Sequence, residues 1–363
     1  MNARRLAARA KHFPRDASRW LSIVRSTPAA DEVRVYYGRD RVPLRDELTH
    51  GGAIKLQTLT DAFPNAPRDF NVLYLVSSAW ADDAGMLVRL ARRRGARVVV
   101  NQNGVAYQAW HGPGYERVNA PRARILHAAR HVVYQSELCK LSADRFYGER
   151  QGSWEVLHNP VATGRFTPAS RVATARLTLL LGGSQYQSYC VQRALATLAR
   201  LPDRFHLIVT GELTWHPDRN RCRREAAALM RAHGLDGRVE FTGPYRQQDA
   251  PDLFRRADIL LHTKYNDPCP TIVLEAMACG LPVAYSASGG TPELVGPDAG
   301  IGIPAPLDWD RDHPPDPAHL AAAVEELGTR LGDFAAAARA RAELFDAQPW
   351  LERHRDLFEE LVR

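Results

Sequence analysis

The stretch of sequence that decides the fold lies between residues 259 and 293. It reads Ile259-Leu260-Leu261-His262, then Asp267-Pro268-Cys269-Pro270-Thr271-Ile272-Val273-Leu274-Glu275-Ala276-Met277-Ala278-Cys279-Gly280-Leu281-Pro282-Val283, and then Ser288-Gly289-Gly290-Thr291-Pro292-Glu293. The apolar run 259–262 is typical of a buried parallel strand, and residues 272–279 have the composition of a helix that ends at Gly280. The pattern therefore predicts a strand, a loop over residues 267–271 and a helix, which together form one unit of an α/β sheet.

This unit carries two carboxylates, Asp267 and Glu275, which stand eight positions apart. A loop at the carboxyl end of a parallel strand faces the crevice in which open α/β sheets bind ligands. Backbone N–H groups at a helix start favour a phosphate, whereas carboxylates accept hydrogen bonds from sugar or ribose hydroxyls. The residues predict a nucleotide-sugar pocket; for Glu275 taken alone, an ordinary capping or solvated helix position is the alternative.

The segment resembles the signature of the family 4 retaining glycosyltransferases, in which two acidic residues separated by seven others precede a Gly-Pro-Val stretch and a later Gly-Gly…Glu. The resemblance implies the GT-B fold, with two Rossmann-like, doubly wound domains facing a cleft. It also implies that Glu275 binds the donor ribose and Asp267 the transferred sugar, while Thr271, Ile272 and Val273 supply backbone donors. In the family the first acidic residue is usually Glu, and a Gly-aromatic-Gly loop follows it. In this chain the residue is Asp267, and Pro268-Cys269-Pro270 follows it. A shorter carboxylate in a stiffer loop is expected to change which donor sugar fits.

Short β-branched runs alternate with helical patterns along nearly the whole chain, which is typical of parallel sheets. The predicted strands are residues 33–36, 72–76, 97–100, 131–134, 155–157, 177–181, 206–209, 239–241 and 259–262. The predicted helices include residues 86–94, 137–146, 191–198, 221–232, 251–255 and 350–362. Pro160 interrupts the chain between the two halves. With these patterns, the family resemblance implies that residues 1–160 form an acceptor-side domain and residues 161–345 a nucleotide-sugar donor domain. It also implies that residues 346–363 form a helix that packs back on the first domain.

The first domain offers several further candidate site residues. Gly51 and Gly52 resemble the family's early glycine loop, where the backbone reaches the donor phosphate or the acceptor; a flexible turn before a helix is the alternative. Lys55 is then either a solvated cation or a phosphate ligand. Asn103 stands near the place where the family often has a histidine that contacts the donor sugar. His111 is the nearest histidine, for which a surface position is the alternative.

The second domain departs from the family where the donor diphosphate is expected. Family members usually place an Arg and a Lys after the first strand of this domain, whereas residues 182–189 contain no cationic side chain. A leaving diphosphate needs charge stabilisation because negative charge builds on it as the glycosidic bond breaks. Lys264 and Arg193 are the candidate substitutes, assisted by Gly183, Ser184 and backbone N–H groups. Lys264 is preferred because its loop lies in the predicted cleft.

Composition fits a chain of two ordinary domains that is balanced in apolar and charged residues. The positive balance of +7 is carried almost wholly by arginine, which supports phosphate or membrane contacts or else reflects genomic base composition. No nucleic-acid partner is expected. The five cysteines are odd in number and show no metal-type pairing, so they indicate reduced thiols in a cytoplasmic protein. No cofactor and no metal are expected, because the sequence shows no metal-binding cluster and GT-B enzymes of this kind do not require one.

The amino-terminal segment is basic and amphipathic, with Arg4, Arg5, Arg9 and Lys11 among Leu6, Phe13, Trp20 and Leu21. It lacks the apolar core of a signal peptide, and no apolar run approaches the length of a membrane span. Such a segment predicts either peripheral contact with an anionic bilayer, as suits a lipid-linked acceptor, or packing on the first domain.

The resemblance implies a retaining glycosyltransferase of the hexosyltransferase type. It would move a sugar from a nucleotide diphosphate sugar to a hydroxyl of a glycan or lipid-linked acceptor, in bacterial cell-surface glycan or glycolipid synthesis. One alternative is a nucleotide-sugar epimerase on the same fold, which needs further catalytic acids. The other is a non-catalytic nucleotide-sugar-binding or scaffold subunit, which the missing Arg/Lys pair motivates.

Overall fold

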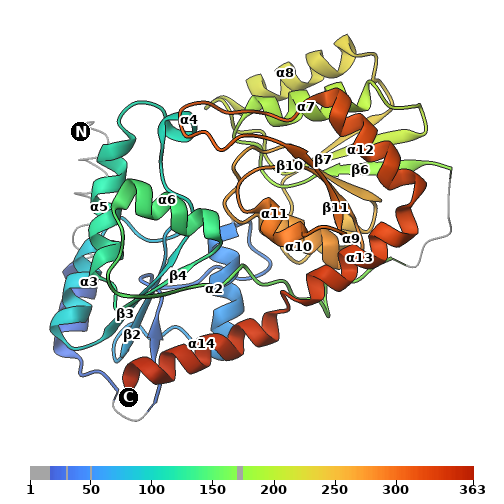
Figure 1. The fold of residues 1–363 in the computed structure, drawn as a ribbon. Coiled ribbons are helices and arrows are strands. Elements are labelled where there is room, and N and C mark those ends of the chain that lie inside the picture. Colours follow the sequence, from blue (N-terminus) through green and yellow to red (C-terminus); the bar gives the residue numbers. More distant parts are fainter. Residues whose placement is uncertain (1–16, 30–31, 50, 170–174) are drawn as a thin grey trace.

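The computed structural model describes residues 17–29, 32–49, 51–169 and 175–363. They form two α/β domains, each built around one parallel β-sheet (Figure 1). The first sheet has the order β1-β2-β3-β4-β5, and every pairing in it is parallel. Its strands are β1 (Val35–Tyr36), β2 (Val72–Val76), β3 (Arg97–Gln102), β4 (His131–Tyr134) and β5 (Ser153–Val156). The β-branched and aromatic residues of these runs are nearly all buried, which is why they form the centre of a covered parallel sheet.

Helices cover both faces of this first sheet. They are α2 (Gly51–Ala62), α3 (Ala84–Arg93), α4 (Gln108–His111), α5 (Tyr115–Ala128) and α6 (Glu137–Tyr147), and residues 17–25 are also helical. One apolar cluster joins the strands to α3, α5 and α6. The other joins them to α2 and to the last helix of the chain, α14 (Ala347–Val362), whose Leu357 and Phe358 are buried there. The last helix of the chain therefore packs on the first domain (Figure 1).

The second sheet has the order β11-β10-β9-β6-β7-β8 and is also parallel throughout. Its strands are β6 (Leu177–Leu181), β7 (Phe205–Thr210), β8 (Val239–Gly243), β9 (Ile259–His262), β10 (Val283–Ala287) and β11 (Gly300–Pro304). Its helices are α7 (Ser188–Leu198), α8 (Arg219–Ala232), α9 (Ala250–Phe254), α10 (Thr271–Ala278), α11 (Thr291–Val295), α12 (Pro317–Thr329) and α13 (Leu331–Glu343). The strand order reverses between β6 and β9, and such a switch point is where an open α/β sheet binds its ligand.

Hydrogen bonds between the domains hold the loop before α10 against the first domain. Ser136 Oγ donates to the carbonyl of Pro268 at 2.6 Å, and Asn159 Nδ2 donates to the carbonyl of Cys269 at 2.7 Å. The Glu293 carboxylate accepts from the first N–H groups of α6, those of Glu137 and Leu138. The ends of both sheets therefore meet at one cleft.

Candidate functional site

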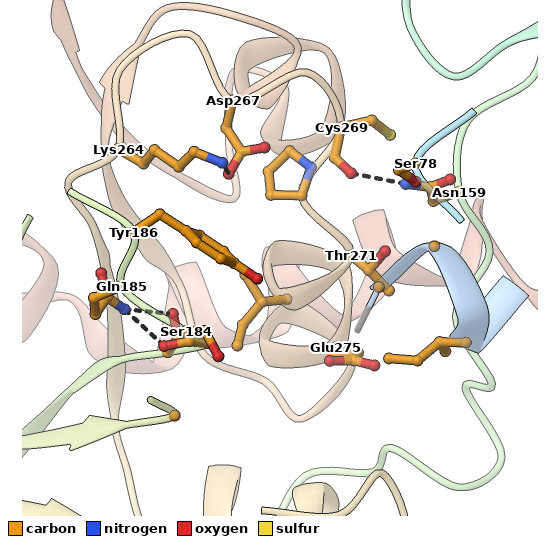
Figure 2. A pocket seen from close by; sticks show the side chains of 18 of the residues that line it. Ser78, Asn159, Ser184, Gln185, Tyr186, Lys264, Asp267, Cys269, Thr271 and Glu275 are labelled. Carbon is orange, nitrogen blue, oxygen red and sulfur yellow. Dashed lines mark hydrogen bonds and ion pairs between the residues drawn. The ribbon is translucent and has the colours of Figure 1, made fainter. Parts of the chain in front are cut away.

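A cleft of about 840 Å³ lies between the two domains (Figure 2). Ten of the thirteen residues predicted as site residues line it, namely Gly51, Gly52, Asn103, Gly183, Ser184, Lys264, Asp267, Thr271, Ile272 and Glu275. Most of the second-domain residues follow β6 or β9, so the switch point of the sheet brings them together. The location of these ten agrees with the sequence analysis, and their roles remain predictions.

Asp267 lies between a cation and a neutral imidazole. Its Oδ2 is 3.0 Å from Lys264 Nζ and 3.6 Å from His262 Nε2. Burial by itself would lower the pKa of Lys264, but the charge of Asp267 and the hydrogen bond to it outweigh burial and raise that pKa. Burial lowers the pKa of His262 to about 4, so its imidazole is neutral at pH 7. The Lys264 ammonium also lies 5.1 Å from the ring centroid of Trp110, which lines the cleft from the first domain.

The backbone around Asp267 explains the Gly289-Gly290 pair of the motif. A Cβ at Gly289 would lie 2.4 Å from the carbonyl oxygen of Asp267, and one at Gly290 would lie 2.0 Å from that of Pro268. Asn266 has φ 48°, a left-handed conformation that Asn tolerates better than most residues, and its N–H donates to Ser288 Oγ at 2.9 Å. The two glycines thus permit the close approach that fixes the Asp267 loop.

Glu275 lies on α10 and is only 5% exposed. Gln247 Nε2 donates to its Oε1 at 2.6 Å. Burial raises the pKa of the Glu275 carboxyl to about 7, although the hydrogen bond from Gln247 and the charge of Arg165 oppose the increase. A carboxylate held at the cleft wall beside one amide donor can accept further hydrogen bonds from a bound hydroxyl.

Because Glu275 titrates at a higher pH in the folded chain than in the unfolded chain, its ionisation destabilises the fold. The penalty is absent below pH 4.5, grows as pH rises, and is complete above about pH 7. It amounts to about 3 kcal/mol at most. We therefore expect Glu275→Gln to raise the unfolding free energy of the ligand-free protein at about pH 8 and to change it little at about pH 5. Urea unfolding at both pH values measures this; the exposed Glu212→Gln is the control, and an equal effect at both pH values would contradict it.

The start of α10 lies between the two carboxylates in Figure 2. Thr271 and Ile272 line the cleft there, and the first N–H groups of a helix have no partner within the helix. The expectation for Val273 is wrong. Its N–H donates to the carbonyl of Pro270 at 3.1 Å and its side chain is fully buried in the core. Val273 lies on the face of α10 that packs into the core together with Leu274 and Met277.

Two further expectations need correction. His111 does not line the cleft: it is exposed at the end of α4, with Nδ1 3.4 Å from the carbonyl of Gly112. The preceding residue, Trp110, faces the cleft in its place. Arg193 lies half-buried on α7 and does not line the cleft either. Both helices turn these side chains away from the site.

The glycine turn after β6 lies against the start of α10, where a Cβ at Gly182 would lie 2.4 Å from Ile272 Cδ1. Gly183 has φ 79°, and Gln185 Nε2 donates to the carbonyls of Gly182 at 3.1 Å and Gly183 at 2.8 Å. Tyr186 follows and is exposed at the cleft edge (Figure 2). The turn offers a tyrosine, a serine and backbone groups, and it adds no cation.

On the first-domain side, Gly51 and Gly52 open α2, and a Cβ at Gly52 would lie 2.5 Å from Ser78 Oγ. The tight fit against Ser78 explains a glycine there. Asn103 follows β3, and its side-chain oxygen accepts from the N–H of Gly104 at 2.8 Å. Lys55 is 3% exposed, so it is not the solvated cation that was one of its two expected states.

Sequence reasoning missed several residues of the cleft. His262 ends the predicted strand 259–262, so its place at a carboxyl strand end was a readable signal. Gln247, Trp110 and Tyr186 stand in loops or a short helix, and no local pattern indicates which way they face. Asn159, the residue before Pro160, was not among the predicted site residues.

The described residues also bear on the predictions about metal sites, cysteines and membrane spans. Among the residues that the structure describes, no group of three His, Cys, Asp or Glu side chains could hold a metal ion. All five cysteines are free thiols and buried. No helix within the described ranges is long and apolar enough to cross a membrane. Residues 1–16 of the basic amino-terminal segment lie outside the described residues.

Comparison with known proteins identifies the fold and relates the second domain to a known protein family. Residues 178–329 match the family model Glycosyl transferases group 1. A D-inositol 3-phosphate glycosyltransferase of Mycobacterium sp. (strain KMS) is 31% identical over 153 residues, which are 39% of this chain and 33% of the relative. The chain thus spans about a third of that relative's length.

Solved structures extend the likeness to both domains. Sucrose-phosphate synthase from Thermosynechococcus elongatus aligns with TM-score 0.66 and 19% identity, covering 80% of this chain and 74% of that one. Anabaena Alr3699/HepE in complex with UDP and glucose aligns with TM-score 0.63 and 17% identity, covering 85% of this chain and 81% of that one. The chain has the predicted GT-B fold, and within it residues 178–329 match the Glycosyl transferases group 1 family.

Proposed function

We propose that the chain is a retaining glycosyltransferase that moves a sugar from a nucleotide diphosphate sugar to a hydroxyl acceptor. The observation that carries the proposal is the wall built by the β9–α10 unit, where Asp267, the start of α10 and Glu275 follow one another along the cleft. The matched relative is named a glycosyltransferase, which supports sugar transfer. The HepE structure is a complex with UDP and glucose, which supports a nucleotide-sugar donor.

Different residues of the cleft would bind different parts of the donor. Glu275 would accept hydrogen bonds from the ribose hydroxyls, and the N–H groups of Thr271 and Ile272 would face the diphosphate. Asp267 would contact the transferred sugar, with Lys264 beside it. In the reaction the bond from the anomeric carbon to the diphosphate oxygen breaks and the bond to the acceptor oxygen forms on the same face. The acceptor proton passes to the departing diphosphate oxygen.

For the acceptor we propose a glycan or lipid-linked glycan in bacterial cell-surface synthesis, at the cytoplasmic side of the membrane. Two apolar residues of the amino-terminal segment, Trp20 and Leu21, lie in the described part of the chain and differ in exposure. Trp20 packs against the first-domain core and its Nε1 donates to Asp83 at 2.8 Å, whereas Leu21 is 53% exposed. Packing on the first domain therefore accounts for Trp20, and Leu21 remains available to a bilayer surface.

A non-catalytic nucleotide-sugar-binding subunit is the second candidate, because residues 182–189 contain no cation. A thermal-shift screen of nucleoside diphosphates and their sugars, followed by assays of donor cleavage with and without sugar acceptors, separates the candidates. A glycosyltransferase releases the nucleoside diphosphate faster when an acceptor is present. A scaffold subunit binds the donor and leaves it intact, and an epimerase converts the sugar without releasing the nucleotide.

Glu275→Gln tests the proposed nucleoside site. We expect it to weaken binding of the preferred nucleoside diphosphate about tenfold or more, because a carboxylate accepts the two ribose hydroxyls better than an amide does. Titration calorimetry measures the affinity at about pH 8, where the wild-type carboxyl is ionised. Unchanged affinity for every nucleotide that stabilises the wild type would remove Glu275 from the site.

A further inference from the structure

Lys55 is a buried cation for which the described residues provide no carboxylate. Its side chain enters the cleft from α2 and is 3% exposed. Its Nζ donates to Asn159 Oδ1 at 3.0 Å, and this amide is its hydrogen-bond partner in the structure. A buried ammonium without an opposite charge costs free energy, so it marks a place where an anion would be stabilised.

The other groups near Lys55 are neutral. Burial raises the pKa of the Cys139 thiol to about 12 and drives that of Cys269 higher still, so neither supplies a thiolate. Lys264, the other lysine of the cleft wall, already has Asp267 at 3.0 Å as its counter-ion. The cleft lining therefore holds one compensated and one uncompensated lysine.

Hydrogen bonds connect Lys55 to the loop before α10. Asn159, which accepts from Lys55, donates through Nδ2 to the carbonyl of Cys269 at 2.7 Å. Cys269 lies two positions after Asp267 and two before Thr271. Figure 2 shows the same order along the cleft, with Asn159 beside Cys269. Lys55 is thus tied to the wall at a point between the proposed sugar contact and the start of α10.

We propose that Lys55 binds the sugar-bearing phosphate of the donor diphosphate and holds the negative charge that the leaving group gains. The inference rests on the proposed function and supplements Lys264 as the expected cation. Three positions are assigned along the wall: ribose at Glu275, the diphosphate at Thr271 and sugar at Asp267. The phosphate that carries the sugar lies between the last two, which is the level of Cys269 and therefore of Lys55.

Lys55→Met tests this assignment. The probes are the diphosphate among UDP, GDP, ADP and dTDP that most stabilises the wild type, its nucleoside monophosphate, and its nucleoside. We expect the variant to bind the diphosphate about ten- to a hundredfold more weakly, as for loss of a charge-assisted hydrogen bond, and to bind the monophosphate and nucleoside as the wild type does. Lys140→Met, whose lysine pairs with Asp144 away from the cleft, is the matched control.

A purely structural role for Lys55 predicts a different result. If the ammonium only anchors Asn159, Lys55→Met lowers the Tm of the ligand-free protein and weakens all three probes equally, which overturns the proposal. Lys55→Gln keeps a donor for Asn159 without the charge and shows the selective loss even if the Met variant does not fold. A wild type that binds none of the diphosphates overturns the proposed function itself, whereas a variant that keeps the diphosphate preference overturns only the role of Lys55.

Discussion

Asp267→Asn is expected to lower sugar transfer about a hundredfold or more and to leave binding of the bare nucleoside diphosphate nearly unchanged. The carboxylate is placed at the sugar end of the proposed donor site, away from Glu275 (Figure 2). Its loop is held by bonds that the substitution does not remove, such as that from the N–H of Asn266 to Ser288 Oγ. The change therefore removes charge at the reacting sugar and keeps the backbone in place.

The comparison of two ligands makes this test selective. Affinities for the nucleoside diphosphate and its sugar are measured beside the transfer rate. Asp312→Asn is a suitable control, because Asp312 accepts from Gln187 at 2.8 Å and does not line the cleft. Equal losses of affinity for both ligands would place Asp267 elsewhere on the donor.

Local sequence predicted the strands of the fold well. Residues 72–76, 131–134, 177–181 and 259–262 were predicted with the observed bounds, because buried parallel strands are short apolar runs with clear ends. β10 and β11 were not named. β11 begins with a glycine and ends with a proline, so its place at the sheet edge comes from pairing with β10 and not from its own propensity.

In the site, too, residues placed by one local unit were predicted, and the contacts between distant parts of the chain were not. Asp267, Lys264 and Glu275 lie within twelve positions of one another, so one strand-loop-helix unit places all three. The bond between Lys55 and Asn159 joins residues 104 positions apart, and that between Asn159 and Cys269 joins residues 110 apart. Only the docking of two domains brings these groups together. Local pattern also cannot tell which side chain of the short helix α4 faces the cleft, and this is why His111 was expected where Trp110 lies.

Lys264→Met is expected to lower turnover about a hundredfold and donor affinity much less, because charge on the diphosphate grows as the bond to the sugar breaks. Arg193→Met is the control and is expected to change little, since Arg193 does not line the cleft. Transfer that survives Lys264→Met and is lost in Arg193→Met would instead assign the charge to α7. If neither change matters in an active enzyme, backbone donors and Lys55 carry the diphosphate without Lys264.

The ion pair with Asp267 allows a second explanation of a loss at Lys264, and a double-mutant cycle separates the two. If Lys264 acts on the diphosphate and Asp267 on the sugar, the effects of Lys264→Met and Asp267→Asn on turnover multiply. If Lys264 only orients Asp267, the double variant is no slower than Asp267→Asn alone. We expect an intermediate result nearer to multiplication, because an ammonium 3.0 Å from the carboxylate serves both groups at once. A double variant equal to Asp267→Asn would make Lys264 a positioning residue and leave Lys55 as the cation of the leaving group.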